Sequence, residues 1–171
     1  MLNLLKPDLY VNQLQDVPLP ELIHAGIRGI IIDLDNTITA WNSPEVTGDI
    51  FNWFQEMKQH QFQVCLVSNN GKARVAVVAD KLGIPFIFKA SKPRRRSFRQ
   101  AMEVLGTKPP ETAVIGDQVF TDVLGGNRLN LYTILVVPLN KREFIGTRFM
   151  RQLENIVIKT VVKKKMGESD A

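Results

Sequence analysis

Two aspartates at the end of an apolar run are the residues of this chain best suited to chemistry. Isoleucines fill positions 30–32, Asp33 follows directly, and Asp35 stands two positions later. The apolar run predicts a buried strand, and carboxylates at its end predict either a polar turn that closes the strand or a site. Paired carboxylates in such a site could bind a metal ion or attack an electrophile.

Further polar side chains follow the later apolar runs. Ser68 comes after the run 62–67, Lys92 after 85–88, and Asp117 with Asp122 after 112–115. A carboxylate can attack phosphorus, a divalent cation offsets the repulsion between the two anions, and hydroxyl or ammonium donors bind the transferred oxygens. The combination is therefore suited to phosphoryl transfer through an aspartyl-phosphate.

The segments between these strands have helical patterns. We predict four helices between and after these strands. The first has Ile50, Phe54 and Met57 on one face, and the second runs over 72–82 and ends before Gly83. The third ends before Gly106 and has an apolar face of Phe98, Ala101, Met102 and Leu105, and the fourth follows Asp122. A short helix near 18–24 precedes the first strand, and a last strand covers 131–137. The alternation predicts an α/β fold, a Rossmann-like three-layer sandwich with a parallel sheet.

Composition is that of an ordinary globular protein. The 171 residues are 44% hydrophobic and 23% charged, which predicts a single domain over 1–171. No apolar stretch reaches the roughly 18 residues of a membrane span, and the N-terminus has no signal-peptide pattern. The one cysteine, Cys65, lies in an apolar run and is expected to be a buried structural thiol. We expect an intracellular, cytoplasmic protein.

The net charge of +5 is unevenly distributed and predicts an anionic partner. Arg94, Arg95 and Arg96 form a basic cluster shortly after Lys92. A basic amphipathic helix is predicted at about 146–165, and two interpretations of it stay open: contact with a membrane surface, or packing on the sheet with a solvated basic face. The first interpretation would place the protein peripherally on the inner face of an anionic membrane.

The motifs resemble those of the haloacid dehalogenase (HAD) superfamily of phosphatases. Asp-x-Asp-x-Thr stands at Asp33, Asp35 and Thr37, and the later motifs stand at Ser68, Lys92, Asp117 and Asp122. The resemblance implies a nucleophile at Asp33 and a general acid and base at Asp35. It also implies Mg²⁺ held by Asp33, the Asp35 carbonyl and Asp117, with Thr37 and Asp122 in support. Ser68, Asn69 and Lys92 would bind the phosphoryl oxygens.

The spacing of the motifs and the residues within them narrow the resemblance to one subgroup of the superfamily. Asp33 and Ser68 are 35 residues apart, and Ser68 and Lys92 are 24 apart, so neither gap can hold a cap domain of at least about 50 residues. Asp-Leu-Asp-Asn-Thr and Ser-Asn-Asn, the latter beginning at Ser68, resemble the capless subclass IIIA YqeG-like phosphatases. That group is similar to the mitochondrial and plastid phosphatidylglycerophosphate phosphatases.

These observations predict an enzyme, a Mg²⁺-dependent phosphomonoester hydrolase. The resemblance favours phosphatidylglycerophosphate, a membrane-borne substrate of phospholipid biosynthesis, which Arg94, Arg95 and Arg96 could contact together with the membrane. One alternative is a soluble HAD phosphatase for a sugar, nucleotide or protein phosphate. An alternative of another class is a non-catalytic module that binds nucleic acid or a ribosome, but the intact Asp33/Asp35 pair argues against it, so no nucleic-acid partner is expected.

Overall fold

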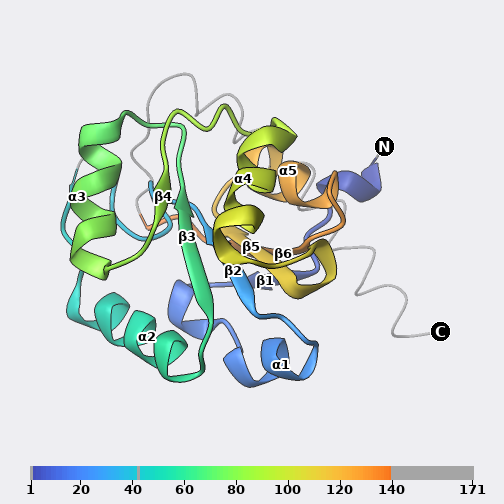
Figure 1. The fold of residues 1–171 in the computed structure, drawn as a ribbon, viewed down its shortest axis with the longest axis horizontal. Coiled ribbons are helices and arrows are strands. Elements are labelled where there is room, and N and C mark those ends of the chain that lie inside the picture. Colours follow the sequence, from blue (N-terminus) through green and yellow to red (C-terminus); the bar gives the residue numbers. More distant parts are fainter. Residues whose placement is uncertain (1, 42, 140–171) are drawn as a thin grey trace.

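A six-stranded parallel sheet forms the centre of the protein in a computed structural model, which describes residues 2–41 and 43–139 (Figure 1). The strands run in the order β1-β6-β5-β2-β3-β4, and in the central register Ile31 of β2 pairs with Cys65 on one side and Val114 on the other. The strands are β1 (Leu9–Val11), β2 (Gly29–Ile32), β3 (Gln63–Val67), β4 (Phe86–Ile87), β5 (Thr112–Gly116) and β6 (Tyr132–Val136).

Helices cover both faces of this sheet, as the sequence predicts for a strand that is apolar at every position (Figure 1). Ile30 and Ile32 of β2 face the core with α1, α2 and α3, whereas Ile31 faces the core with α4. A Cβ atom at Gly125 of α5 would lie 2.4 Å from the Phe98 ring of α4, so glycine is needed there. The helices are α1 (Leu19–His24), α2 (Gly48–Gln59), α3 (Lys72–Leu82), α4 (Arg95–Leu105) and α5 (Leu124–Asn127).

The predicted α/β class and parallel sheet are confirmed, and most predicted elements are found within a residue or two. Strand β1 was not predicted, because a three-residue edge strand beside β6 has too short a pattern to detect. The helix expected after Asp122 begins before it, as a π-helical turn, η4 (Val119–Val123), and continues into the single turn α5. Shorter 3₁₀ segments are η1 (Leu2–Leu5), η2 (Leu14–Asp16) and η3 (Pro109–Glu111). The predicted helix at 146–165 lies outside the described residues.

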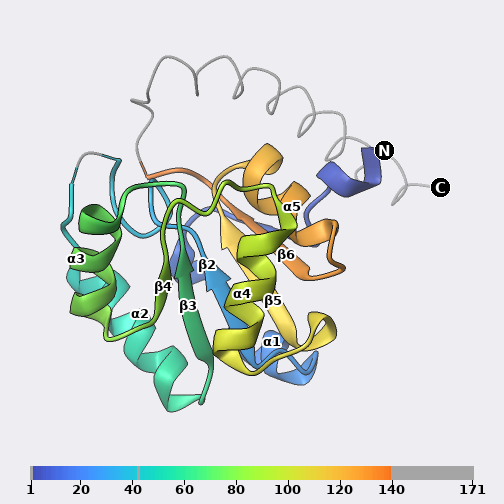
Figure 2. The same ribbon diagram turned by 45° about the horizontal axis from the view of Figure 1, so that its top comes forward.

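The carboxyl ends of all strands meet at one edge of the sheet (Figure 2). The chain leaves β2 for β3 on one side, and β5 lies on the other side, so the end of β2 is the switch point at which open α/β sheets build ligand sites. Only residues 33–47 separate β2 from α2, and only residues 68–71 separate β3 from α3. Within the described chain, therefore, neither segment holds a cap domain over this edge.

No helix of residues 2–41 and 43–139 combines the length and the apolar character that crossing a bilayer requires.

Candidate active site

Asp33 occupies the centre of the candidate site because it is the first residue after the central strand β2. Its backbone N–H donates to the Ile115 carbonyl of β5 at 2.9 Å, which continues the sheet register for one more residue. The chain then turns sharply, and Asn36 adopts a left-handed conformation with φ of 60°, which asparagine tolerates better than most residues. This turn directs Asp33 and Asp35 toward the edge of the sheet.

A buried lysine joins three segments of the site. The Lys92 ammonium lies 2.5 Å from Oδ1 of Asp33 and 2.7 Å from Oδ1 of Asp122, and no more than 8% of any of the three side chains is exposed. A Cβ atom at Gly116 would lie 2.3 Å from the Asp122 carboxylate, so glycine at the end of β5 is what lets this carboxylate approach. The β2 end, the β4–α4 loop and η4 are thereby joined by one cation.

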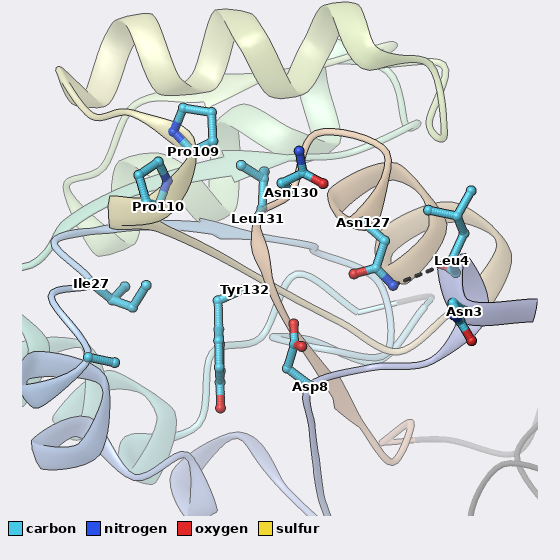
Figure 3. Close-up of a pocket in the computed structure, with 11 residues that line it drawn as sticks. Asn3, Leu4, Asp8, Ile27, Pro109, Pro110, Asn127, Asn130, Leu131 and Tyr132 are labelled. Atoms are coloured by element: carbon cyan, nitrogen blue, oxygen red, sulfur yellow. Dashed lines mark hydrogen bonds between the residues drawn. The ribbon is translucent and has the colours of Figure 1, made fainter.

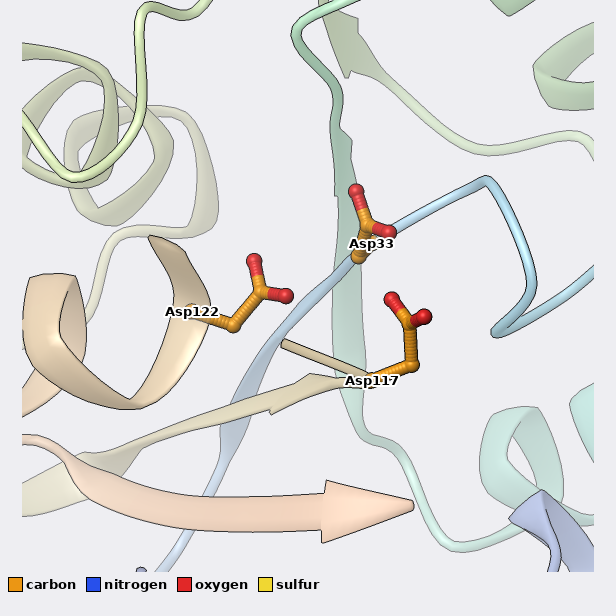
Figure 4. A group of neighbouring side chains, drawn as sticks. All are labelled: Asp33, Asp117 and Asp122. Carbon is orange, nitrogen blue, oxygen red and sulfur yellow. The ribbon is translucent and has the colours of Figure 1, made fainter. Parts of the chain in front are cut away.

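Three carboxylates converge beside this lysine. Asp33, Asp117 and Asp122 are all buried, and each offers an oxygen within 4.8 Å of the others (Figure 4). One ammonium cannot balance three carboxylates when all are ionised. Oxygen ligands of this kind and number are what hard divalent cations bind, so the donor set fits such an ion. The approach of Asp122 was expected from the sequence only as support for the metal site.

The shared burial changes the acidity of these groups. The pKa of Asp33 is raised from 3.8 to about 7, chiefly because burial disfavours the charged form; repulsion from Asp122 and Asp35 acts in the same direction, and the Lys92 ammonium opposes both effects. Burial alone would lower the pKa of Lys92, but attraction to Asp122 and Asp33 outweighs it and raises that pKa above its ordinary value. Lys92 therefore stays charged, and Asp33 is the residue whose ionisation depends on added positive charge.

Asp35 has a separate set of partners, which the sequence reasoning missed. Arg74 of α3 donates to Oδ1 of Asp35 through Nε at 2.8 Å and through a terminal nitrogen at 2.6 Å, and the Asn70 amide donates to Oδ2 at 2.5 Å. Arg74 also donates to the carbonyls of Ala40 and Ser43, so the same guanidinium fixes the loop after β2. The sequence contained one signal for this contact: Arg74 stands in the first turn of a helix that begins just after Ser-Asn-Asn.

Ser68 and Asn69 lie where the sequence predicts, at the end of β3 beside Lys92. The Ser68 hydroxyl accepts a hydrogen bond from the Asn70 backbone at 3.1 Å. The Asn69 side chain accepts one from the Lys92 backbone N–H at 2.7 Å, so it holds the Lys92 loop in place. Both residues therefore have a structural role and also line the site cavity.

The site cavity is small and polar. It measures about 160 Å³ and is lined by Asp33, Asp35, Ser68, Asn69, Asn70, Lys92, Gln118 and Thr121, of which Gln118 and Thr121 were not predicted. Thr37 is buried, and its hydroxyl has no hydrogen-bond partner among the described residues. The basic residues Arg94, Arg95 and Arg96 are exposed and do not line this cavity. The cavity can hold a phosphate-sized group but no lipid.

A larger cavity of about 480 Å³ lies at the opposite edge of the sheet, and Figure 3 shows the residues that line it. Ile27, Pro110 and Tyr132 line it, and they stand before or at the amino ends of β2, β5 and β6. The Asp8 carboxylate at its wall already accepts hydrogen bonds from the backbone and hydroxyl of Thr133. Asp33 and Asp35 line the smaller cavity and not this one.

A family model, two relatives and a solved structure are similar to this chain. The family model "Mitochondrial PGP phosphatase" matches residues 2–138. The YqeG protein of Bacillus subtilis (strain 168), which is named as a phosphatase, is 42% identical over 158 residues, 92% of each chain. The mitochondrial phosphatidylglycerophosphatase of Saccharomyces cerevisiae is 26% identical over 148 residues, 78% of each. A HAD-family hydrolase structure from Streptomyces avermitilis superposes with a TM-score of 0.56 at 20% identity over 72% of each chain.

The raised pKa of Asp33 predicts how stability depends on pH when metal is removed. Because the folded protein favours protonated Asp33, this group's stabilisation is complete below its ordinary pKa of 3.8 and is lost as the pH rises toward about 7. In a chelator, Asp33→Asn should therefore gain stability over the wild type as the pH rises from about 4 to 7, by up to about 4 kcal/mol. Urea denaturation at a series of pH values measures this difference.

The control for that series is Asp80→Asn, which neutralises an exposed carboxylate on α3. Its stability should follow the wild-type pH curve. Parallel curves for Asp33→Asn and the wild type would show that Asp33 ionises normally in the folded protein.

Proposed function

The chain belongs to the mitochondrial PGP phosphatase family of the HAD superfamily, and from this premise we propose that it hydrolyses phosphatidylglycerophosphate with Mg²⁺ as its ion. That the chain is a phosphatase follows from its family; the lipid substrate, the ion and the residue roles are the proposal. The relative from Saccharomyces cerevisiae is named for this lipid phosphate. Because the family consists of phosphatases, the alternative of a non-catalytic module that binds nucleic acid or a ribosome is set aside.

The observation that carries the proposal is the shape of the site. A polar cavity of about 160 Å³ stands at a sheet edge that no cap covers within the described residues. Such a site can enclose a terminal phosphate while the remainder of the substrate stays outside. Most of the surface of a small soluble substrate would have no contact with this protein, whereas a lipid can remain in its bilayer and present only the phosphate.

The proposed chemistry begins with attack by Asp33 on phosphorus. An Asp33 carboxylate oxygen forms a bond to phosphorus as the bond to the leaving oxygen breaks, and Asp35 gives that oxygen a proton. Asp35 then accepts a proton from water, the water oxygen attacks the aspartyl-phosphate at phosphorus, and phosphate leaves with Asp33 restored. Ser68, Asn69 and Lys92 bind the phosphoryl oxygens during both steps.

The metal in this proposal would be held by Asp33, the backbone carbonyl of Asp35 and Asp117, with Asp122 and Thr37 in support. The convergence of buried carboxylates supports this assignment. Bound Mg²⁺ supplies positive charge that keeps Asp33 ionised and offsets its repulsion from the substrate phosphate.

Peripheral contact with an anionic membrane is also part of the proposal. Arg94, Arg95 and Arg96 are exposed at the beginning of α4. Figure 2 shows this end of α4 at the edge of the sheet where the strands end. Basic residues near an anionic bilayer are each worth about 1 kcal/mol of attraction. This placement would turn the uncovered site toward the membrane surface, on its inner face.

A substrate panel tests the proposed function. With Mg²⁺ present, kcat/KM for phosphatidylglycerophosphate in mixed micelles should exceed that for glycerol 3-phosphate, sugar phosphates, nucleotides and phosphopeptides by about 100-fold or more. The reason is that contacts with parts of the substrate away from the reacting phosphate also stabilise the transition state. Asp33→Asn should abolish turnover, and Asp80→Asn should retain it. Turnover of a soluble phosphate without turnover of the lipid would refute the lipid assignment.

Arg74 should position Asp35 as the acid that protonates the leaving group. If so, Arg74→Ala should lower kcat/KM much more for an alkyl phosphate, whose leaving group needs a proton, than for 4-nitrophenyl phosphate, whose leaving group does not. We expect a difference of about 10- to 100-fold, which is smaller than the roughly 10²- to 10⁴-fold of a complete general-acid contribution because Asn70 still donates to Asp35. Arg74→Lys should restore part of it. The measurement is kcat/KM over a series of leaving groups, since this constant reports the first phosphoryl transfer.

Lys81→Ala is the matched control for that series. Lys81 donates to the Pro44 carbonyl at 3.1 Å and so holds the same loop from the same helix, without touching Asp35. If Lys81→Ala steepened the leaving-group dependence as much as Arg74→Ala, loop anchoring alone would explain the effect and the positioning role of Arg74 would be wrong.

A further inference from the structure

A further cavity lies beside the segment that carries Lys92, since residues on both sides of Lys92 in the sequence line it. It measures about 280 Å³ and is lined by Lys89, Arg94 and Arg96, together with the polar side chains of Ser91 and Gln100. No acidic side chain lines it. The cavity is therefore a cationic recess at the same edge of the sheet as Asp33.

The positive charge of this recess is not balanced within the described residues. The ion pairs of this part of the chain involve Arg28, Arg74 and Lys92, and none involves Lys89, Arg94 or Arg96. Three cations that converge on one cavity repel one another unless an anion lies between them. The recess is thus organised to receive negative charge from outside the described chain.

The beginning of helix α4 supports the same conclusion. The first turn of a helix carries partial positive charge and normally has a capping side chain and acidic residues. Here Arg94 is the N-cap, Arg95 and Arg96 follow it, no side chain caps the helix, and the first turn holds no acidic residue. This arrangement destabilises an empty helix end, whereas an anion in the recess would bind both the helix end and the arginines.

The recess is held at a fixed place relative to the active site. The backbone N–H groups of Lys89 and Ala90 donate to the carbonyls of Asn70 and Ser68, at 2.9 and 3.0 Å. Lys89 and Ser91 have left-handed backbones, with φ of 48° and 55°, which non-glycine residues adopt only where their surroundings enforce it. Because Lys89 is three residues from Lys92, their Cα atoms are at most about 11 Å apart.

We propose that this recess binds a second phosphate group of the same substrate molecule. The inference rests on the proposed function in one respect, because phosphatidylglycerophosphate carries a phosphodiester one glycerol unit away from the phosphate that is removed. The terminal phosphate would lie in the site with Lys92, and the phosphodiester would lie between Lys89, Arg94 and Arg96. Charge-assisted hydrogen bonds from arginine and lysine are the usual means of binding such a group.

The test uses two soluble substrates that differ only in a second phosphate: 1,3-propanediol bisphosphate and propyl phosphate. The wild-type protein should show a higher kcat/KM for the bisphosphate. Replacing the two arginines in Arg94→Gln/Arg96→Gln should lower the ratio of the two kcat/KM values by about tenfold or more, the size of one or two lost charged hydrogen bonds. Lys89→Gln should lower the ratio in the same direction.

Arg95→Gln is the matched control, because it removes the same charge from the same helical turn but lies outside the cavity lining. Both substrates are soluble, so the membrane contact proposed for Arg95 does not affect the ratio. It should leave the ratio within about twofold of the wild-type value, since charges not in contact are screened by salt. The arginine variants remove cations from the positive end of a helix, so their melting temperatures should not fall. A lower ratio therefore cannot come from loss of folding.

Three results would overturn the proposal: no wild-type preference for the bisphosphate, an equal change on both substrates in the arginine variants, or the same change in Arg95→Gln. Loss of binding to anionic phospholipid vesicles with an unchanged ratio would also overturn it, because the recess would then serve the membrane and not the substrate. A normal bisphosphate preference without turnover of phosphatidylglycerophosphate would refute the proposed lipid substrate and leave the second phosphate site standing.

Discussion

The buried ammonium of Lys92 is the constraint on which the site depends. Its contacts with Asp33 and Asp122 join the end of β2, the β4–α4 loop and η4, which come from distant parts of the chain. Removing Lys92 would leave the buried carboxylates of Asp33 and Asp122 without their counter-charge, which is strongly destabilising. The surrounding structure is accordingly fixed: Asn69 holds the Lys92 backbone, and Gly116 gives Asp122 room. The sheet edge is thus shaped by electrostatics as well as by packing.

The same cluster explains how the proposed site would bind an anion although it is rich in carboxylates. Asp33 has a raised pKa because burial and the neighbouring aspartates disfavour its charged form, even with Lys92 in contact. A divalent cation and the ammonium together would reverse that balance, so that Asp33 ionises and a phosphate is attracted. Asp35 is kept apart from this cluster by its own partners, Arg74 and Asn70, so two aspartates two positions apart have different surroundings. Different surroundings are what two different roles require.

The sequence predicted what depends on local pattern. The apolar run before Asp33, the helix over 72–82 with Gly83 after it, and the placement of Ser68 and Lys92 beyond their strands all follow from periodicity and parallel topology. Asp117 was likewise placed correctly at the end of β5. These features could be predicted because each is set by neighbouring residues or by the rule that parallel strands end at one edge.

What the sequence did not predict depends on contacts across the fold. The pairing of Asp35 with Arg74 spans 39 residues and requires the relative placement of a loop and a helix. The recess beside Lys92 requires knowing that Arg94 and Arg96, but not Arg95, face one cavity. Strand β1 exists only because β6 offers it an edge. Charge and spacing alone carry none of this information.

The central claim is that Asp33 carries the phosphoryl group during turnover, and chemical trapping at this residue tests it most directly. Protein quenched with acid during turnover of its substrate with Mg²⁺, then reduced with borohydride, should contain homoserine in place of aspartate at position 33, detected by peptide mass spectrometry. The product should be absent without substrate. Trapping at Asp35 instead, or turnover with no trapped residue under conditions that trap a known aspartyl-phosphate, would contradict the account.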